Sequence, residues 1–343
     1  MKRFYCSCGA EIFFENTICF NCGKLVGIDI VGSEMFTLKT KGNGLLSATM
    51  GMNTRHYRFC KHRSPDTLGC NILVRENDPE EQCVSCRLTR TIPDQSIPRN
   101  VKRWRTLEEA KRRMVFNMHR NRLPYQTRME NPVSGLCFDF LEDRRSNPNV
   151  FEEIVYTGHS SGVITVNAAE ADPEYRASMQ EEMNERYRTT LGHFRHELGH
   201  YFWMTLIQGT KWERPFDVLF GDHRRDYDAA LKEYYANGPA EDWVEHHISA
   251  YSSMHPLEDW AETWAHYLHM MDTLETAVSF GVVNVDIENG NFRDVIGKWV
   301  ELTIIMNSLN RSVGKADAYP FVLSNEVYEK LTFIRNVILA SRR

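Results

Sequence analysis

Apolar residues are spaced differently in the two parts of the chain. Up to residue 98, short β-rich runs alternate with glycine-bearing turns, and no helical spacing of apolar residues is present. From Thr106 onward the spacing becomes helical, because Thr106 and Glu109 match a capping box and apolar residues then recur at helical intervals. We therefore predict a small domain over residues 1–98 and a larger one over residues 99–343.

The second part begins with strands and continues with helices. β-rich runs cover residues 135–142 and 150–167, in which 162–167 is the clearest strand. Strands followed by a run of helices predict an α+β fold rather than alternating βαβ units. The strand 162–167 is either a buried core strand or an exposed edge that adds an extended peptide to a sheet, and the pattern favours neither. Helical spacing follows over residues 173–189, 191–208, 226–236, 256–276, 292–309 and 324–341.

The overall composition is that of a globular protein without a membrane span. Apolar residues make up 42% and charged residues 25% of the 343 residues, which supplies enough material for a core. Apolar runs are interrupted by charges well short of the roughly 20 residues that a membrane span requires. The first residues are basic but lack the apolar stretch of a secretory signal, so we expect a cytoplasmic protein.

A short histidine motif provides the strongest chemical signal. His196, Glu197 and His200 form the pattern His-Glu-x-x-His within the helix expected over 191–208. Residues four apart share a helix face, so both imidazoles can bind one metal ion. Zinc in such a site lowers the pKa of a bound water, and Glu197 is placed to accept its proton as the water attacks a carbonyl. The motif predicts a zinc site with Glu197 as general base.

A third ligand is expected on the helix over 256–276, because a catalytic zinc usually takes three protein ligands. Glu258, Glu262 and His269 share one face of this helix, with His266 near its edge. One carboxylate can bind the ion while the other, one turn later, orients a ligand histidine. Helix geometry alone permits either glutamate as the ligand. A second metal on His266 and His269 is a minor alternative.

The segment from Glu258 to Glu262, Glu-Asp-Trp-Ala-Glu, is similar to the glutamate helix of the gluzincins, in particular of anthrax lethal-factor-type proteases. In those enzymes the first glutamate binds zinc, and a tyrosine at the offset found here for Tyr251 polarises the substrate carbonyl. The resemblance therefore implies that Glu258 is the third ligand and that Glu262 orients a ligand histidine. It also implies that Tyr251 stabilises the oxyanion.

Longer stretches resemble a family of zinc-binding metallopeptidases that carry an N-terminal zinc ribbon. They cover residues 83–93, 187–200 and 255–269. The resemblance implies a small cysteine-rich domain followed by a zincin-like catalytic domain, in which a small sheet accompanies the active-site helix and the glutamate helix. It does not imply a particular substrate.

Eight of the nine cysteines lie before residue 90, in groups typical of structural zinc sites. Tight turns that carry paired thiolates each make half of a tetrahedral site, which is the arrangement of a zinc ribbon. We predict two structural zinc ions in addition to the catalytic one, although ligands of the two sets could interleave. The first set is Cys6, Cys8, Cys19 and Cys22, and the second, more loosely spaced, is Cys60, Cys70, Cys83 and Cys86.

Three details of the cysteine sites stay open. His62 is the first substitute ligand if one cysteine proves to be free. Iron in a rubredoxin-like site is a minor alternative, because tetrahedral sulfur sites suit both metals. Cys137 stands alone and is expected to be a buried apolar residue.

The segment 99–128 is rich in basic residues, with ten Lys and Arg against only Glu108 and Glu109. Beside zinc ribbons, such a segment is compatible with nucleic-acid binding. A helix face that pairs with an acidic catalytic domain is the simpler interpretation.

These patterns leave two main hypotheses of different classes. In the first, the protein is a zinc-dependent metallopeptidase that acts on a peptide or protein substrate. In the second, it is a zinc-ribbon module that binds nucleic acid or protein, with a secondary or inactive zincin domain. A DNA-associated protease would combine the two. The first is favoured, because an inactive relative would be expected to have lost a member of the set His196, Glu197, His200, Glu258 and Tyr251.

Overall fold

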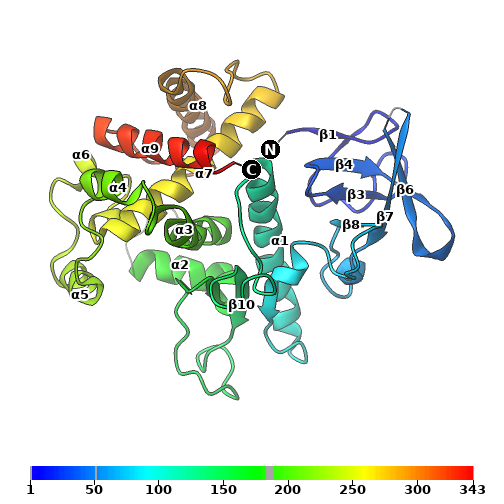
Figure 1. Cartoon of the computed structure of the whole chain (residues 1–343), viewed down its shortest axis with the longest axis horizontal. Helices are drawn as coiled ribbons and strands as arrows, with labels where there is room; N and C mark the ends of the chain where they lie inside the picture. The colour runs from blue at the N-terminus through cyan, green and yellow to red at the C-terminus, as the bar shows by residue number, and fades with distance from the viewer. Residues whose placement is uncertain (1, 51, 183–188, 343) are drawn as a thin grey trace. The chain divides into compact units, whose positions relative to one another are not determined.

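The computed structural model describes residues 2–50, 52–182 and 189–342 (Figure 1). By their internal contacts they form two compact units, Arg3–Arg176 and Ala177–Arg342, which are described in turn. All described strands belong to the first unit, and the second unit is helical. The chain is thus a mixed α and β protein with a cysteine-rich N-terminal module, as the sequence predicts.

The cysteine-rich part is built from short antiparallel strands. Two hairpins come first, formed by β1 (Phe4–Tyr5) with β2 (Glu11–Ile12) and by β3 (Val26–Asp29) with β4 (Glu34–Thr37). A sheet follows in the order β5 (Lys39–Thr40), β6 (Leu46–Met50), β7 (Asn53–Phe59) and β8 (Leu73–Arg75). Strands this short bury little apolar surface, and small modules of this kind usually need metal sites or disulfides for stability.

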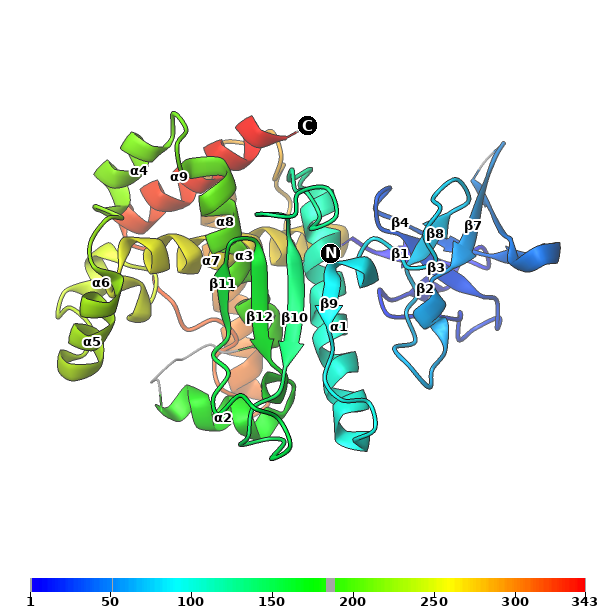
Figure 2. The same cartoon turned by 60° about the horizontal axis from the view of Figure 1, so that its bottom comes forward.

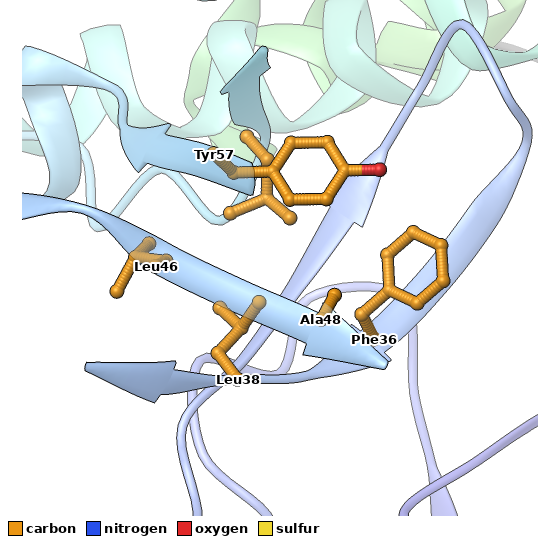
Figure 3. Packing of buried hydrophobic residues seen from close by; sticks show 6 residues of the cluster. Phe36, Leu38, Leu46, Ala48 and Tyr57 are labelled. Carbon is orange, nitrogen blue, oxygen red and sulfur yellow. The ribbon is translucent and has the colours of Figure 1, made fainter. Parts of the chain in front are cut away.

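A small hydrophobic core lies between these strands (Figure 3). Leu46 and Ala48 are two positions apart on β6, so both side chains point to the same face of the sheet. Phe36, Leu38 and Tyr57 belong to the same buried cluster, and the rings of Phe36 and Tyr57 lie 5.7 Å apart. This core holds the second hairpin against the sheet.

A second sheet contains both parallel and antiparallel strands (Figure 2). Its strand order is β11 (Gly158–Ser160), β12 (Val163–Asn167), β10 (Cys137–Leu141) and β9 (Thr89–Thr91). β12 is parallel to β10 on one side and antiparallel to β11 on the other. The interpretation of residues 162–167 as an exposed edge is therefore wrong, and the buried core strand is right. Ile164 and Val166 are buried accordingly, as is Cys137 on β10.

Helix α1 (Pro98–Arg120) connects β9 to the parallel strand β10 and completes a βαβ crossover that the sequence does not predict. The expected capping box at Thr106 is wrong, because Thr106 lies inside this helix. The helix begins at Pro98 instead, in the first turn, where a missing backbone N–H costs nothing. The predicted boundary between residues 98 and 99 falls within the first compact unit, and the division into domains over 1–98 and 99–343 stays a prediction.

The pattern of apolar residues does not predict the start of α1, because the buried face of the helix is polar there. Asn100 is fully buried and donates to Oε1 of Glu142 at 2.6 Å. Arg103 is buried as well, and its guanidinium binds Asp172 at 2.7 Å. Buried polar side chains need such partners, but they leave no apolar periodicity for a pattern to detect.

Basic residues of the segment 99–128 make contacts within their own unit. Lys111 is fully buried in an ion pair with Glu108 at 2.8 Å. Arg112 is also buried, and although burial lowers its pKa, the nearby Cys70 and Glu108 raise it by more. These side chains therefore do not form a free basic surface. Carboxylates or backbone oxygens also engage Arg99, Arg103, Arg105 and Arg113.

Helices make up the second unit. Its first three are α2 (Pro173–Glu182), which begins in the first unit, α3 (Thr190–Phe202), which continues as a π-helical turn over Trp203–Ile207, and α4 (Glu213–Phe220). Residues 183–188 of the expected helix 173–189 lie outside the described residues. The helices α4 and α6 are absent from the prediction, since short helices show little periodicity. The others are α5 (Tyr227–Asn237), α6 (Trp243–His246), α7 (Pro256–Ser279), α8 (Phe292–Ser312) and α9 (Asn325–Ser341).

Helix α7 lies at the centre of this unit, with α3 and α9 packed against it (Figure 1). Trp260 and Trp264 are fully buried and stand one turn apart. Rings from neighbouring elements close around them, with centroids 4.9 Å apart for Phe202 and Trp264 and 5.8 Å apart for Phe220 and Trp260. Among the described helices, none is both long and apolar enough to cross a lipid bilayer.

Candidate metal and catalytic site

Helices α3 and α7 approach each other closely at a glycine. A Cβ atom added to Gly199 would lie 2.9 Å from Cα of Ala261, which is closer than real Cβ contacts come. The indole Nε1 of Trp260 donates to the carbonyl oxygen of Gly199 at 2.8 Å across the same contact. This packing brings the His-Glu-x-x-His segment of α3 beside the two glutamates of α7.

Three candidate ligands converge at this contact. His196 Nε2 lies 3.2 Å from His200 Nε2 and 3.0 Å from Oε2 of Glu258. His200 Nε2 lies 3.3 Å from Oε1 of Glu258. Zinc bonds of about 2.0–2.1 Å place tetrahedral ligand atoms roughly 3.3 Å apart. Two imidazoles and a carboxylate at these separations therefore fit zinc in both geometry and chemistry.

Glu262 contacts the opposite side of the His196 ring. Its Oε1 lies 2.8 Å from His196 Nδ1, and its Oε2 accepts from the Ser249 hydroxyl at 2.7 Å. Burial opposes the charge of Glu262, but the bond to His196 lowers its pKa to about 2. A ring that donates from Nδ1 to this carboxylate turns the lone pair of Nε2 toward Glu258, as in carboxylate–histidine–metal arrangements.

The predicted catalytic side chains lie next to these ligands. Glu197 is 7% exposed on α3, between the two histidines in sequence. Tyr251 lies on the 3-10 turn Tyr251–Ser253 before α7, and its ring centroid is 6.3 Å from that of His196. Burial and the Glu258 carboxylate raise the pKa of Tyr251 well above its ordinary value. The structure thus brings together the side chains that the sequence singles out.

One residue at this site is absent from the sequence prediction. Tyr227, at the start of α5, donates its hydroxyl to Oε1 of Glu258 at 2.9 Å. Its hydroxyl is also near enough to Tyr251 that the two influence each other's pKa. No motif links position 227 to position 258, so only the packing of α5 against the start of α7 reveals this contact.

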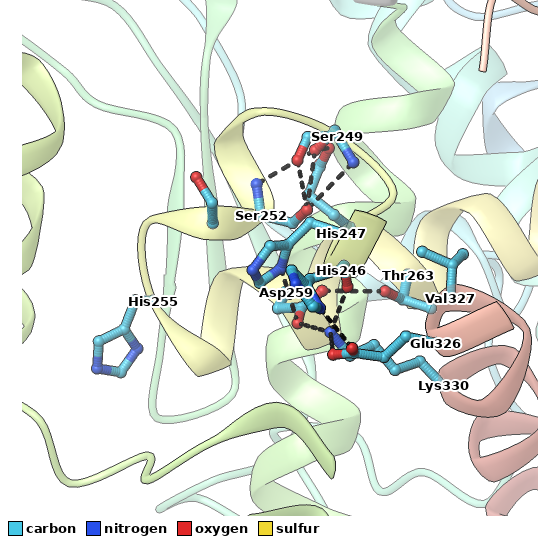
Figure 4. A network of polar contacts seen from close by, with 12 residues as sticks. His246, His247, Ser249, Ser252, His255, Asp259, Thr263, Glu326, Val327 and Lys330 are labelled. Carbon is cyan, nitrogen blue, oxygen red and sulfur yellow. Dashed lines mark hydrogen bonds and ion pairs between the residues drawn. The ribbon is translucent and has the colours of Figure 1, made fainter. Parts of the chain in front are cut away.

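A buried polar network around Asp259, the residue after Glu258, holds the start of α7 in place (Figure 4). Asp259, the neighbour of Glu258, is fully buried and lies 2.8 Å from Nζ of Lys330 on α9. His247 Nδ1 lies 3.1 Å from the same carboxylate oxygen. Lys330 also donates to the carbonyl oxygen of His246 at 2.6 Å. The network ties α7 to α9 and to the segment before Tyr251.

His266 and His269 are engaged elsewhere. His266 Nδ1 contacts the Tyr319 hydroxyl, and burial lowers the pKa of His266 to about 4. His269 Nδ1 lies 2.6 Å from the guanidinium of Arg195. Within the part of the chain that the structure describes, neither histidine belongs to a group of three candidate ligands. The second metal considered for this pair therefore lacks a ligand set.

The first cysteine cluster gathers Cys6, Cys8, Cys19 and Cys22. Sulfur separations are 3.6 Å for Cys6 and Cys22 and 3.7 Å for Cys8 and Cys19. These values exclude disulfides, whose S–S bond is about 2.05 Å. They match the roughly 3.8 Å edge of a tetrahedron with zinc–sulfur bonds of about 2.3 Å. Burial opposes ionisation of Cys6, but a hydrogen bond from Thr37 helps to lower its pKa to about 6.

The second cluster is fully buried and consists of Cys60, Cys70, Cys83 and Cys86. Cys70 Sγ lies 3.8 Å from Sγ of both Cys83 and Cys86. The two sets therefore do not interleave, and each fits one tetrahedral ion. His62 is not part of the cluster, since its ring packs edge-on against Trp104 with centroids 5.3 Å apart.

Another group of candidate metal ligands in the helical unit does not support a metal site. Asp217, Asp222 and His223 lie close together on and after α4. Arg224 already pairs with both aspartates, at 3.0 and 2.7 Å. The carboxylates of this group are thus already engaged in ion pairs with Arg224.

The chain combines a candidate His/His/Glu metal centre on two helices with a module that contains two four-cysteine clusters. A family model described as "Putative zinc-binding metallo-peptidase" matches residues 100–337, and a zinc-ribbon model matches residues 3–97. The chain belongs to this zinc-binding metallo-peptidase family and carries an N-terminal zinc ribbon.

Relatives of the chain match it in sequence over nearly their whole length. An uncharacterized protein of Mycobacterium tuberculosis and one of Mycobacterium bovis are each 36% identical to it over 347 residues. The match covers 98% of this chain and 95% of each relative. A comparison with solved structures finds no match.

The close contact between α3 and α7 can be tested by a substitution that adds one methyl group at position 199. We expect Gly199→Ala to cost about 1–3 kcal/mol of stability, the usual scale of overpacking, and to weaken metal binding because α7 must shift. Urea unfolding and metal titration would measure the two effects. Gly297→Ala on α8 is the matched control, because an added Cβ there meets no atom within 4 Å. Equal behaviour of the two variants would contradict this account.

Proposed function

We propose that the protein is a zinc-dependent metallopeptidase that hydrolyses peptide bonds, with zinc held by His196, His200 and Glu258. The convergence of these three side chains, with each histidine Nε2 3.0–3.3 Å from one oxygen of Glu258 and 3.2 Å from the other histidine, is the observation that carries the proposal. Zinc at such a centre supplies Lewis acidity, which polarises a carbonyl and makes water easier to deprotonate. The remaining steps fall to side chains around the ligands.

Glu197 is proposed as the general base. A carboxylate between two ligand histidines on one helix is well placed to accept a proton from the attacking water and to return it to the leaving amine. Glu262 would hold His196 in the tautomer that binds metal, which the 2.8 Å contact to Nδ1 supports. Tyr251 would donate a hydrogen bond to the developing oxyanion, since its raised pKa keeps the hydroxyl protonated near neutral pH.

Each four-cysteine cluster is proposed to hold one structural zinc. The sulfur separations support this assignment, and cysteines that bind zinc and form no disulfide fit the cytoplasmic location expected from the sequence. A nucleic-acid partner for the segment 99–128 draws less support, because Arg103, Lys111 and Arg113 are engaged in ion pairs. The proposed partner is therefore a peptide or protein substrate.

Digestion of an unbiased peptide library tests the proposed activity. Zinc-loaded protein should cleave peptides, and Glu197→Gln should abolish cleavage while retaining zinc, because Glu197 is not a ligand. Mass spectrometry of the products would also give the preferred cleavage sites. The proposal fails if the zinc-loaded wild-type protein cleaves nothing, or if Glu197→Gln cleaves as fast as wild type.

Metal content gives a second prediction, namely three zinc ions per chain by elemental analysis. The four-cysteine sites should resist mild chelation, whereas the His/His/Glu site should exchange its ion more readily. Cys22→Ser should release one ion and leave the His/His/Glu zinc bound. One zinc or none in a fully active protein would refute this stoichiometry.

The roles of the two glutamates give a third prediction. Glu258→Gln should greatly weaken zinc binding, because it removes a charged bond to the ion. Glu262→Gln should weaken it less, within the roughly 10–100-fold range typical of groups that orient a ligand. Tyr251→Phe should keep the zinc but slow turnover roughly 100-fold or more. If Glu262→Gln empties the site while Glu258→Gln does not, the two roles are reversed.

A further inference from the structure

The two carboxylate oxygens of Glu258 have different surroundings. Oε2 lies 3.0 Å from His196 Nε2. Oε1 lies 3.3 Å from His200 Nε2 and also accepts the hydroxyl hydrogen of Tyr227 at 2.9 Å. Because one oxygen already receives a hydrogen bond from the protein, the two oxygens are not equally available to a metal ion.

Tyr227 is held firmly where it meets Glu258. It is the first residue of α5, and the N-cap Asp226 fixes that helix end by accepting from Ala229 N at 2.9 Å. The Tyr227 ring packs edge-on against His255, with centroids 5.2 Å apart. The position of the hydroxyl is thus set by the helix start and by one ring contact.

His255 links the segment just before α5 to the first turn of α7. As the N-cap of α7, its Nδ1 accepts from Leu257 N at 3.2 Å. Its Nε2 therefore carries the hydrogen and donates to the carbonyl oxygen of Arg225 at 3.2 Å. The ring is 2% exposed. This bridge keeps Tyr227, at the start of α5, in register with Glu258, in the first turn of α7.

We propose that Tyr227 is a positioning residue that holds Oε1 of Glu258 and so leaves Oε2 as the oxygen for the metal. The inference rests on the proposed zinc site and deepens it, because it assigns a role to a side chain outside the ligand set. Hydrogen bonds on the non-metal side of a ligand restrict its orientation, and their loss typically costs about 10–100-fold in metal affinity or activity. Tyr227 acts through Glu258, whereas Tyr251 is proposed to act on the substrate.

Tyr227→Phe in the full chain tests this role, because it removes the hydroxyl and keeps the ring against His255. Zinc affinity of the His/His/Glu site, measured by chelator competition, should fall about 10–100-fold. The absorption bands of the cobalt-substituted site should shift, because the carboxylate is no longer restrained. Tyr328→Phe on α9 is the matched control, since it removes a tyrosine hydroxyl from the same unit without a contact to Glu258.

A double-substitution cycle separates positioning from a general structural effect. In a Glu258→Ala background, Tyr227→Phe should cause a much smaller further loss of zinc affinity, because the side chain that accepts its hydroxyl hydrogen is already gone. Equal losses in both backgrounds would overturn the inference, as would wild-type zinc affinity and an unchanged cobalt spectrum in Tyr227→Phe. If the wild-type protein holds no metal at His196 and His200, the proposed function fails together with the inference.

Discussion

The site depends on the close packing of α3 and α7 at Gly199 and Ala261. On α3 the contact residue lies three positions after His196 and one before His200, and on α7 Ala261 lies three after Glu258 and one before Glu262. Residues three or four apart share a helix face. Each contact residue therefore stands among the functional side chains of its own helix. A larger residue at position 199 would separate the helices and the ligand atoms with them.

Buried charges set the orientation of α7 around this contact. Asp259 points away from the ligand face and is paired with Lys330, and the partly exposed Asp272 further along is paired with the buried Arg195 of α3. Buried ion pairs add little net stability, but leaving one partner alone costs about 3–5 kcal/mol. A rotation of α7 that moved Glu258 off the site would break these pairs. These ion pairs thus fix the orientation of α7 more than they add to the free energy of unfolding.

The sequence predicts those parts of the site that depend on spacing within one element. The separation of His196 and His200 by four residues defines a helix face without any tertiary information, and the Glu258 to Glu262 spacing does the same. Tyr227 and Glu258 are 31 positions apart in the sequence, so a periodic pattern within one element cannot predict their contact. The start of α1 is missed for a related reason, since its buried face is made of paired polar side chains such as Asn100.

The two kinds of metal site differ in how much structure surrounds their ligands. His196 is held by Glu262, which Ser249 holds in turn, and Glu258 is held by Tyr227, all on helices or turns packed around a large aromatic core. These contacts hold His196 and Glu258 from the sides that face away from the proposed metal position. The first cysteine cluster lies on short hairpins with little core of their own, and in small modules of this kind metal binding and folding are usually coupled. On the proposed assignment, an ion in the cysteine cluster would link the hairpins to each other, whereas an ion between α3 and α7 would bind to side chains that hydrogen bonds already position.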